Sequence, residues 1–123
     1  MTTYVIYEKG DDFSSKTIEN IKGYLNKKLY YKKYKIKFYF MLKNNLCPDI
    51  FLIISNNIEF IRKKTNYLAP KNKIIIVTNI IKYNDISYLF NITNNVIYSN
   101  ANIEKIILKI VTVYYKNNLT FKL

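Results

Sequence analysis

Apolar residues along the chain form short continuous runs, separated by longer stretches in which they recur every three or four positions. The runs cover residues 4–7, 49–54, 73–78 and 96–98, and they predict four strands. The second and third runs are apolar almost throughout, which is typical of strands buried on both faces of a parallel sheet. Strands that alternate with helices in one short chain indicate βαβ units with right-handed crossovers.

The stretches between these runs predict helices. The first helix begins at Asp12 or Ser14 as its N-cap, and a later helix is stopped by Pro70. A short helix is expected around 86–90. The clearest amphipathic stripe follows Asn102, which is predicted to cap it, and residues 117–123 are expected to form a loose tail.

Residues 29–46 leave two alternatives open, because their aromatic residues fit the period of a strand in part and that of a helix in part. Either a strand covers about 35–41 with a loop up to Pro48, or a short strand near 30–33 precedes a helix that ends near Asn45. Either alternative supplies a fifth strand. We therefore predict an α/β fold, a three-layer sandwich around a five-stranded parallel sheet of the flavodoxin-like kind, with residues 1–123 as a single domain.

Composition excludes several kinds of chemistry. The 123 residues contain no His, which rules out histidine triads and His-ligated zinc. Cys47 is the only cysteine, so no disulfide forms within the chain. Two glycines are too few for a phosphate-cradling loop or a dinucleotide fingerprint. We expect no cofactor, no metal and no enzymatic activity. The apolar runs are too short to cross a bilayer, and a cytoplasmic protein is expected.

The net charge of +12 raises the alternative of nucleic-acid binding. Residues 22–43 are rich in Lys and Tyr and contain no acidic residue, so they offer phosphate attraction and base stacking. Against this, A/T-rich codons account for much of the lysine, and Arg62 is the only arginine. A solvated basic face explains the same residues. The candidate contacts are Lys27, Lys28, Lys32, Lys33, Lys35 and Lys37.

Polar residues follow each predicted strand, where an open parallel sheet binds ligands. Their order and spacing resemble the receiver domain of two-component response regulators. Pro48-Asp49, which leads into the third strand, and Thr78, which ends the fourth, match that family's motifs. The resemblance implies a (βα)5 fold and a regulatory role in signal transduction or transcription.

The family's phosphorylation site is only partly present. Receivers carry an acidic pair after the first strand, a phosphoacceptor Asp and a Lys after the last strand. In this chain Glu8 takes one position of the acidic pair and Lys9 replaces the other. Ile54 or Ser55 stands in place of the phosphoacceptor, and Ser99 or Asn100 stands in place of the Lys. The pocket residues are Glu8, Lys9, Ile54, Ser55, Thr78, Ser99 and Asn100. Without a second carboxylate or a carboxylate nucleophile, we expect a degenerate receiver that is not phosphorylated.

Such a domain is expected to act by binding another protein or its own copy, and a homodimer is plausible. By resemblance to receivers, the candidate interaction face consists of Tyr83, Tyr88, Tyr98, Ile103 and Ile107, some of which must belong to the core. A minor alternative is a Toll/interleukin receptor-like domain, in which Glu59 would take the place of the glutamate of NAD-cleaving members.

Overall fold

The sheet of the protein is parallel and lies between two layers of helices. The computed structural model describes residues 2–27, 37–39, 48–68, 70–98 and 102–119. The strands pair in the order β2-β1-β3-β4-β5, which is the order of flavodoxin-like sheets. Their bounds are β1 Thr2–Tyr7, β2 Lys37–Tyr39, β3 Ile50–Ile54, β4 Ile74–Thr78 and β5 Val96–Tyr98. The predicted α/β class and parallel sheet are confirmed.

Strand lengths differ across the sheet. β1, β3 and β4 are the long strands, and each lies between two neighbours. β2 adds only three residues at one edge, where Lys37 to Tyr39 pair with the first half of β1. Of the two alternatives for residues 29–46, the strand over 35–41 contains β2, while residues 28–36 and 40–47, including Cys47, lie outside the described part of the chain.

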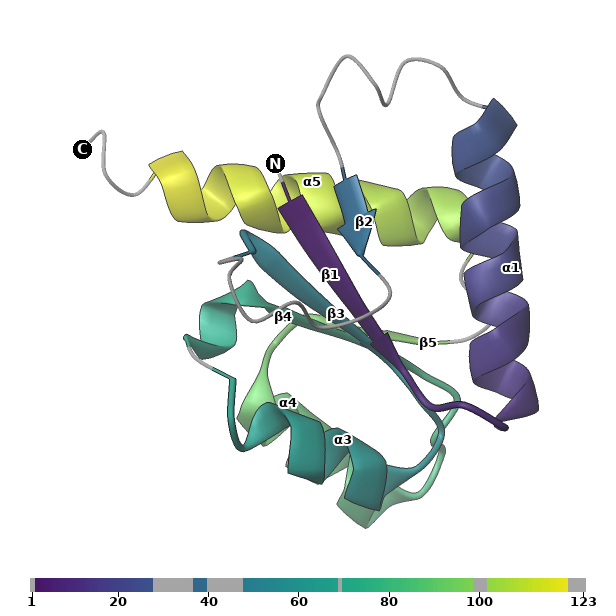
Figure 1. The fold of residues 1–123 in the computed structure, drawn as a ribbon. Helices are drawn as coiled ribbons and strands as arrows, with labels where there is room; N and C mark the ends of the chain where they lie inside the picture. Colours follow the sequence, from purple (N-terminus) through teal and green to yellow (C-terminus); the bar gives the residue numbers. More distant parts are fainter. Residues whose placement is uncertain (1, 28–36, 40–47, 69, 99–101, 120–123) are drawn as a thin grey trace.

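Helices cover both faces of the sheet, α1 and α5 on one side and α3 and α4 on the other (Figure 1). The first pair encloses a core that includes Ile54, Val77 and Ile107, and the second pair encloses one that includes Ile53, Ile76 and Leu89. Side chains of β3 and β4 therefore enter both cores, as the continuous apolar runs predict. The bounds are α1 Asp12–Lys27, α3 Ile58–Thr65, α4 Tyr83–Ile92 and α5 Ile103–Leu119, with a 3-10 turn η1 at Lys71–Lys73.

The start of α1 differs from the prediction. The Asp11 carboxylate accepts hydrogen bonds from the backbone N–H of Ser14 (3.2 Å) and from its hydroxyl (2.6 Å). Asp11 is therefore the N-cap, and the prediction of Asp12 or Ser14 is wrong. Ser14 cannot serve as the cap because it lies within the first turn of α1, where its own N–H is one of the groups that Asp11 caps. Its buried hydroxyl lies 3.0 Å from the carbonyl oxygen of Ile54. Gly10, at a φ of 88°, turns the chain from β1 into this cap.

The last helix is longer than predicted. Asn102 caps it as expected, since its side-chain oxygen accepts a hydrogen bond from the N–H of Lys105 (2.9 Å). α5 continues to Leu119, so the predicted loose tail is wrong for 117–119. Asn117 fixes this end: its side-chain amide donates to the carbonyl oxygen of Asn72 (3.2 Å) and its side-chain oxygen accepts from the Asn72 amide (3.3 Å). No helix in the described part of the chain is long and apolar enough to span a membrane.

Candidate functional site

Two of the predicted pocket residues meet at the carboxyl edge of the sheet. The hydroxyl of Ser55, just after β3, donates a hydrogen bond to a carboxylate oxygen of Glu8, just after β1 (2.8 Å). Ser55 is fully buried, whereas Glu8 is half-buried. β1 and β3 are neighbours, so the parallel pairing brings these residues together across 47 positions of sequence.

Hydroxyl side chains at this edge also form hydrogen bonds with the loops that connect the strands to the following helices. The Ser55 hydroxyl accepts from the N–H of Asn57 (2.9 Å), and the Asn57 side chain caps α3. In the next connection, the buried hydroxyl of Thr78 accepts from the N–H of Ile80 (3.2 Å). Each hydroxyl thus orders the loop that follows its own strand. For Thr78 this is the ordinary structural role of a hydroxyl at the end of a strand.

The other predicted pocket residues are placed differently. Ile54 is fully buried in the core beneath α1 and α5, so Ser55 is the residue that occupies the edge. Lys9 is exposed to solvent. Ser99 and Asn100 lie outside the described residues. Asp49 of the Pro48-Asp49 motif lies at the opposite edge, where its carboxylate accepts from the N–H of Thr2 (2.7 Å).

A groove of about 470 Å³ opens beside this edge, between the loops that follow β3 and β4. The backbone N–H of Asn79 donates to the side-chain oxygen of Asn56 (2.6 Å), which joins the two loops. Ile80 and Ile81 line the groove, and Ile81 is 83% exposed. Sequence reasoning missed Ile81, because an apolar residue in a short loop carries no periodic signal.

The predicted interaction face is only partly at the surface. Tyr83 is 81% exposed, and Tyr88, Tyr98 and Ile103 are half-buried. Ile107 is 1% exposed and belongs to the core, so its assignment to the face is wrong. The physical reason is that Ile107 lies on the inward stripe of α5, on the side that packs against the sheet.

Arg62 and Glu59 form an exposed ion pair on α3. The pKa of the Arg62 guanidinium is raised above its usual value, first by its hydrogen bond to Glu59 and then by the carboxylate's charge, with a smaller contribution from Tyr88. The Glu59 carboxylate is half exposed and engaged with Arg62.

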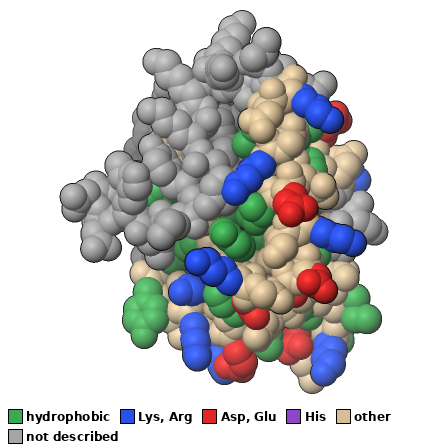
Figure 2. Space-filling model, turned by 45° about the vertical axis from the view of Figure 1, so that its right-hand side comes forward, with side chains coloured by type: hydrophobic (Ala, Val, Ile, Leu, Met, Phe, Trp, Pro, Cys, Tyr) green, Lys and Arg blue, Asp and Glu red, His purple; other side chains and the backbone are tan. Residues whose placement is uncertain are grey.

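The basic residues proposed as nucleic-acid contacts fall mostly outside the described part of the chain. Lys28, Lys32, Lys33 and Lys35 lie there, and only the backbone of Lys37 is described. Lys27 is exposed at the end of α1. Figure 2 brings the side of the molecule with α1 forward, and acidic and basic side chains are interspersed over its described part. Among the residues that the structure describes, no group of three or more His, Cys, Asp or Glu could hold a metal ion.

Comparisons with known proteins support the fold and give no information on the function. No family model and no curated protein matches the sequence. A solved structure described as a yeast Spc42 trimeric coiled-coil segment fused to another structure is similar to this chain, with a TM-score of 0.60 and 15% identity. The match covers 96% of this chain and 83% of that chain. At this identity the likeness shows the α/β fold alone.

Proposed function

We propose that this chain is a receiver-like regulatory domain of the cytoplasm that binds another protein or its own copy and does not accept a phosphoryl group. The strand order supports the proposal, since receivers share it with flavodoxins. In sequence order, Pro48-Asp49 before β3 and Thr78 at the end of β4 also match the motifs of that family.

The observation that carries the proposal is the bond between Ser55 and Glu8. In a receiver, carboxylates at this edge bind a divalent cation and one of them attacks phosphorus. Here the place after β3 holds a buried hydroxyl that donates to Glu8 and accepts from Asn57. The Ser55 hydroxyl and one Glu8 oxygen are engaged in internal hydrogen bonds, and the position after β3 carries no carboxylate of the kind that accepts the phosphoryl group in receivers.

Incubation with acetyl phosphate and Mg²⁺ is expected to leave the intact mass of the protein unchanged. The reason is that no carboxylate nucleophile stands beside Glu8 at the end of β3. A receiver domain that is phosphorylated under the same conditions serves as the positive control. A gain equal to one phosphoryl group, lost when Ser55 is replaced by alanine, would contradict the proposal.

The surface best suited to protein contact is the loop before α4 with the first turn of that helix. Ile81 and Tyr83 are both more than 80% exposed there. Burying one such side chain contributes about 1.5 to 3 kcal/mol. Two copies that each bury both residues gain about 6 to 12 kcal/mol. Association itself costs about 4 to 15 kcal/mol, which offsets most or all of this gain, so the homodimer that we propose is no tighter than about micromolar.

Sedimentation velocity is expected to show a concentration-dependent shift from monomer to dimer between about 10 μM and 1 mM. The double substitution Ile81→Ser with Tyr83→Ser removes the apolar area and is expected to leave a monomer throughout. Tyr67→Ser is the matched control, because Tyr67 is 90% exposed elsewhere on the surface. A wild-type protein that stays monomeric up to the highest concentration would refute self-association.

A further inference from the structure

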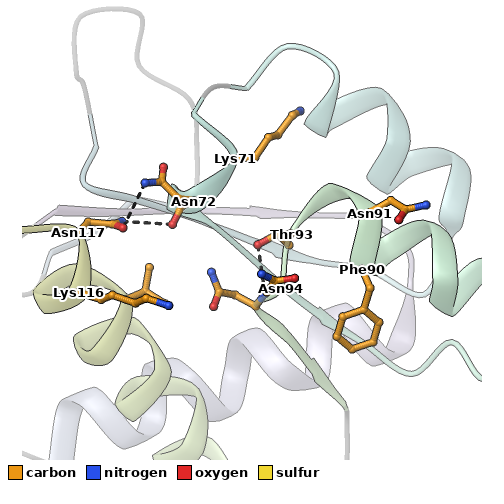
Figure 3. Close-up of a pocket in the computed structure, with 10 residues that line it drawn as sticks. Lys71, Asn72, Phe90, Asn91, Thr93, Asn94, Lys116 and Asn117 are labelled. Carbon is orange, nitrogen blue, oxygen red and sulfur yellow. Dashed lines mark hydrogen bonds between the residues drawn. The ribbon is translucent and has the colours of Figure 1, made fainter. Parts of the chain in front are cut away.

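Two cavities of the described structure differ in whether their charged groups are already engaged. One cavity, of about 250 Å³, lies near the amino ends of β4 and β5 (Figure 3). There the Lys71 amine donates to the carbonyl oxygen of Thr65, and Lys116 also has an interaction partner. Figure 3 shows Asn72 and Asn117 pointing toward one another, and they form two hydrogen bonds. These contacts hold η1 to α3 and α5, so we assign this cavity a structural role.

The groove between the loops that follow β3 and β4, which we call the carboxyl-edge groove, offers charged groups that are available. Lys82, just before α4, is exposed, and Asp85, in the first turn of α4, is half-buried. Both line the groove, and neither side chain forms a hydrogen bond or an ion pair with any residue that the structure describes. The groove therefore presents an ammonium and a carboxylate, three positions apart, for contact with another molecule.

Apolar side chains accompany these two charges. Ile58, Ile80 and the exposed Ile81 line the carboxyl-edge groove, and the exposed Tyr83 follows Lys82 in the chain. The groove volume of about 470 Å³ lies within the range of pockets that hold drug-sized ligands, so it has room for an aromatic side chain. Aromatic side chains that fill pockets contribute much of the binding energy of protein interfaces. The surface therefore offers both a pocket and an aromatic side chain that could fill such a pocket.

We propose that a second copy of this chain occupies the carboxyl-edge groove, related to the first by a two-fold axis, with Tyr83 of each copy in the groove of the other. This inference rests on the self-association proposed above. A two-fold interface brings the same surface of both copies together, so that surface must complement itself. A surface of one sign would repel its copy. Here Lys82 of each copy pairs with Asp85 of the other, and both unpaired charges gain a partner.

The distribution of charge over the chain also favours this edge of the sheet. With a net charge of +12, two copies repel each other, and the repulsion is lower where acidic residues offset the lysines. Five of the eight acidic residues lie in the loops and first helical turns at the carboxyl edge: Glu8, Asp11, Asp12, Glu59 and Asp85. At the opposite edge, the last turn of α3 and η1 are basic. A second copy is therefore expected to dock at the carboxyl edge.

Charge reversal tests this pairing, because a mixture of two variants restores what each variant alone loses. In its own dimer, Lys82→Glu places carboxylates opposite each other, and Asp85→Lys places ammonium groups opposite each other. Each variant is expected to dimerise at about 5- to 30-fold higher concentration in sedimentation velocity at low salt, since two exposed pairs turn from attraction to repulsion. In an equimolar mixture, a dimer with one copy of each variant has two pairs of opposite charge. Its association is expected to return to within about 3-fold of wild type.

Matched controls are Lys105→Glu and Glu104→Lys, which change the net charge by the same amounts at exposed positions of α5, on the other face of the sheet. Their mixture is expected to associate no more strongly than wild type. Circular dichroism establishes that each variant is folded. A wild-type protein that forms no dimer would remove self-association and this inference together. A wild-type protein that dimerises, while the mixture of Lys82→Glu and Asp85→Lys associates no more strongly than either variant alone, would overturn the pairing and leave self-association standing.

Discussion

Replacing Ile107 by alanine is expected to lower the free energy of unfolding by about 2 to 5 kcal/mol, as for other large-to-small changes in a core. Ile107 is 1% exposed and packs in the cluster that contains Ile54 and Val77. The change removes buried methyl and methylene groups and leaves a cavity between α5 and the sheet. Urea denaturation followed by circular dichroism measures the difference.

Leu108 provides a matched control on the same turn of α5. It is the next residue and a similar aliphatic side chain, but it is 65% exposed. Leu108→Ala is expected to change the free energy of unfolding by less than about 0.5 kcal/mol. Should Ile107→Ala leave stability unchanged and instead abolish self-association, Ile107 would belong to an interaction face and the described packing of α5 would be wrong.

Replacing Ser55 by aspartate is expected to destabilise the protein by about 3 to 5 kcal/mol at neutral pH, as an unpaired buried charge does. The new carboxylate takes the place of a fully buried hydroxyl that lies 2.8 Å from a carboxylate oxygen of Glu8. Burial and the like charge of Glu8 both raise the pKa of the introduced group in the folded state. The loss of unfolding free energy caused by Ser55→Asp is therefore small at low pH and grows as the pH rises toward that raised pKa.

Urea denaturation at pH about 4 and about 7 tests this pH dependence. The free energies of unfolding of the variant and the wild type are expected to differ more at pH about 7. Ser55→Ala is the control, because it loses the hydroxyl without adding charge and is expected to cost about 1 to 2 kcal/mol. A variant Ser55→Asp that is as stable as wild type and becomes phosphorylated by acetyl phosphate with Mg²⁺ would show that a working receiver site survives at this edge.

The sequence predicted the strands well because their signal is local. A run such as Ile74–Thr78 is apolar at every position but the last, and a strand buried on both faces requires this pattern. The N-cap of α1 was harder, because Asp11, Asp12 and Ser14 all have suitable side chains. The pattern of suitable side chains does not show which of them precedes the first turn; in the structure the helix begins at Asp12, so Asp11 is the cap.

The candidate sites, too, could be predicted from the sequence only in part. Topology alone placed Glu8 and Ser55 at one edge, since parallel strands end together. Their hydrogen bond could not be predicted, because it depends on the direction of two side chains. The cavity of about 250 Å³ near the amino ends of β4 and β5 could not be predicted, because its lining residues Asn72, Phe90 and Lys116 come from separate segments and no short window of sequence contains them.

The face of the sheet under α5 has a consequence for synthesis. Ile106, Ile107, Ile110 and Val113 complete a core that begins with Val5, and α5 is the last described element to leave the ribosome. Until it emerges, that face of β3 and β4 stays open to water on the nascent chain. Exposed apolar sheet of this kind is what chaperones bind and what drives aggregation. Translation that stalls before residue 103 therefore yields a polypeptide without α5, in which α1 is left as the one described helix on that side of the sheet.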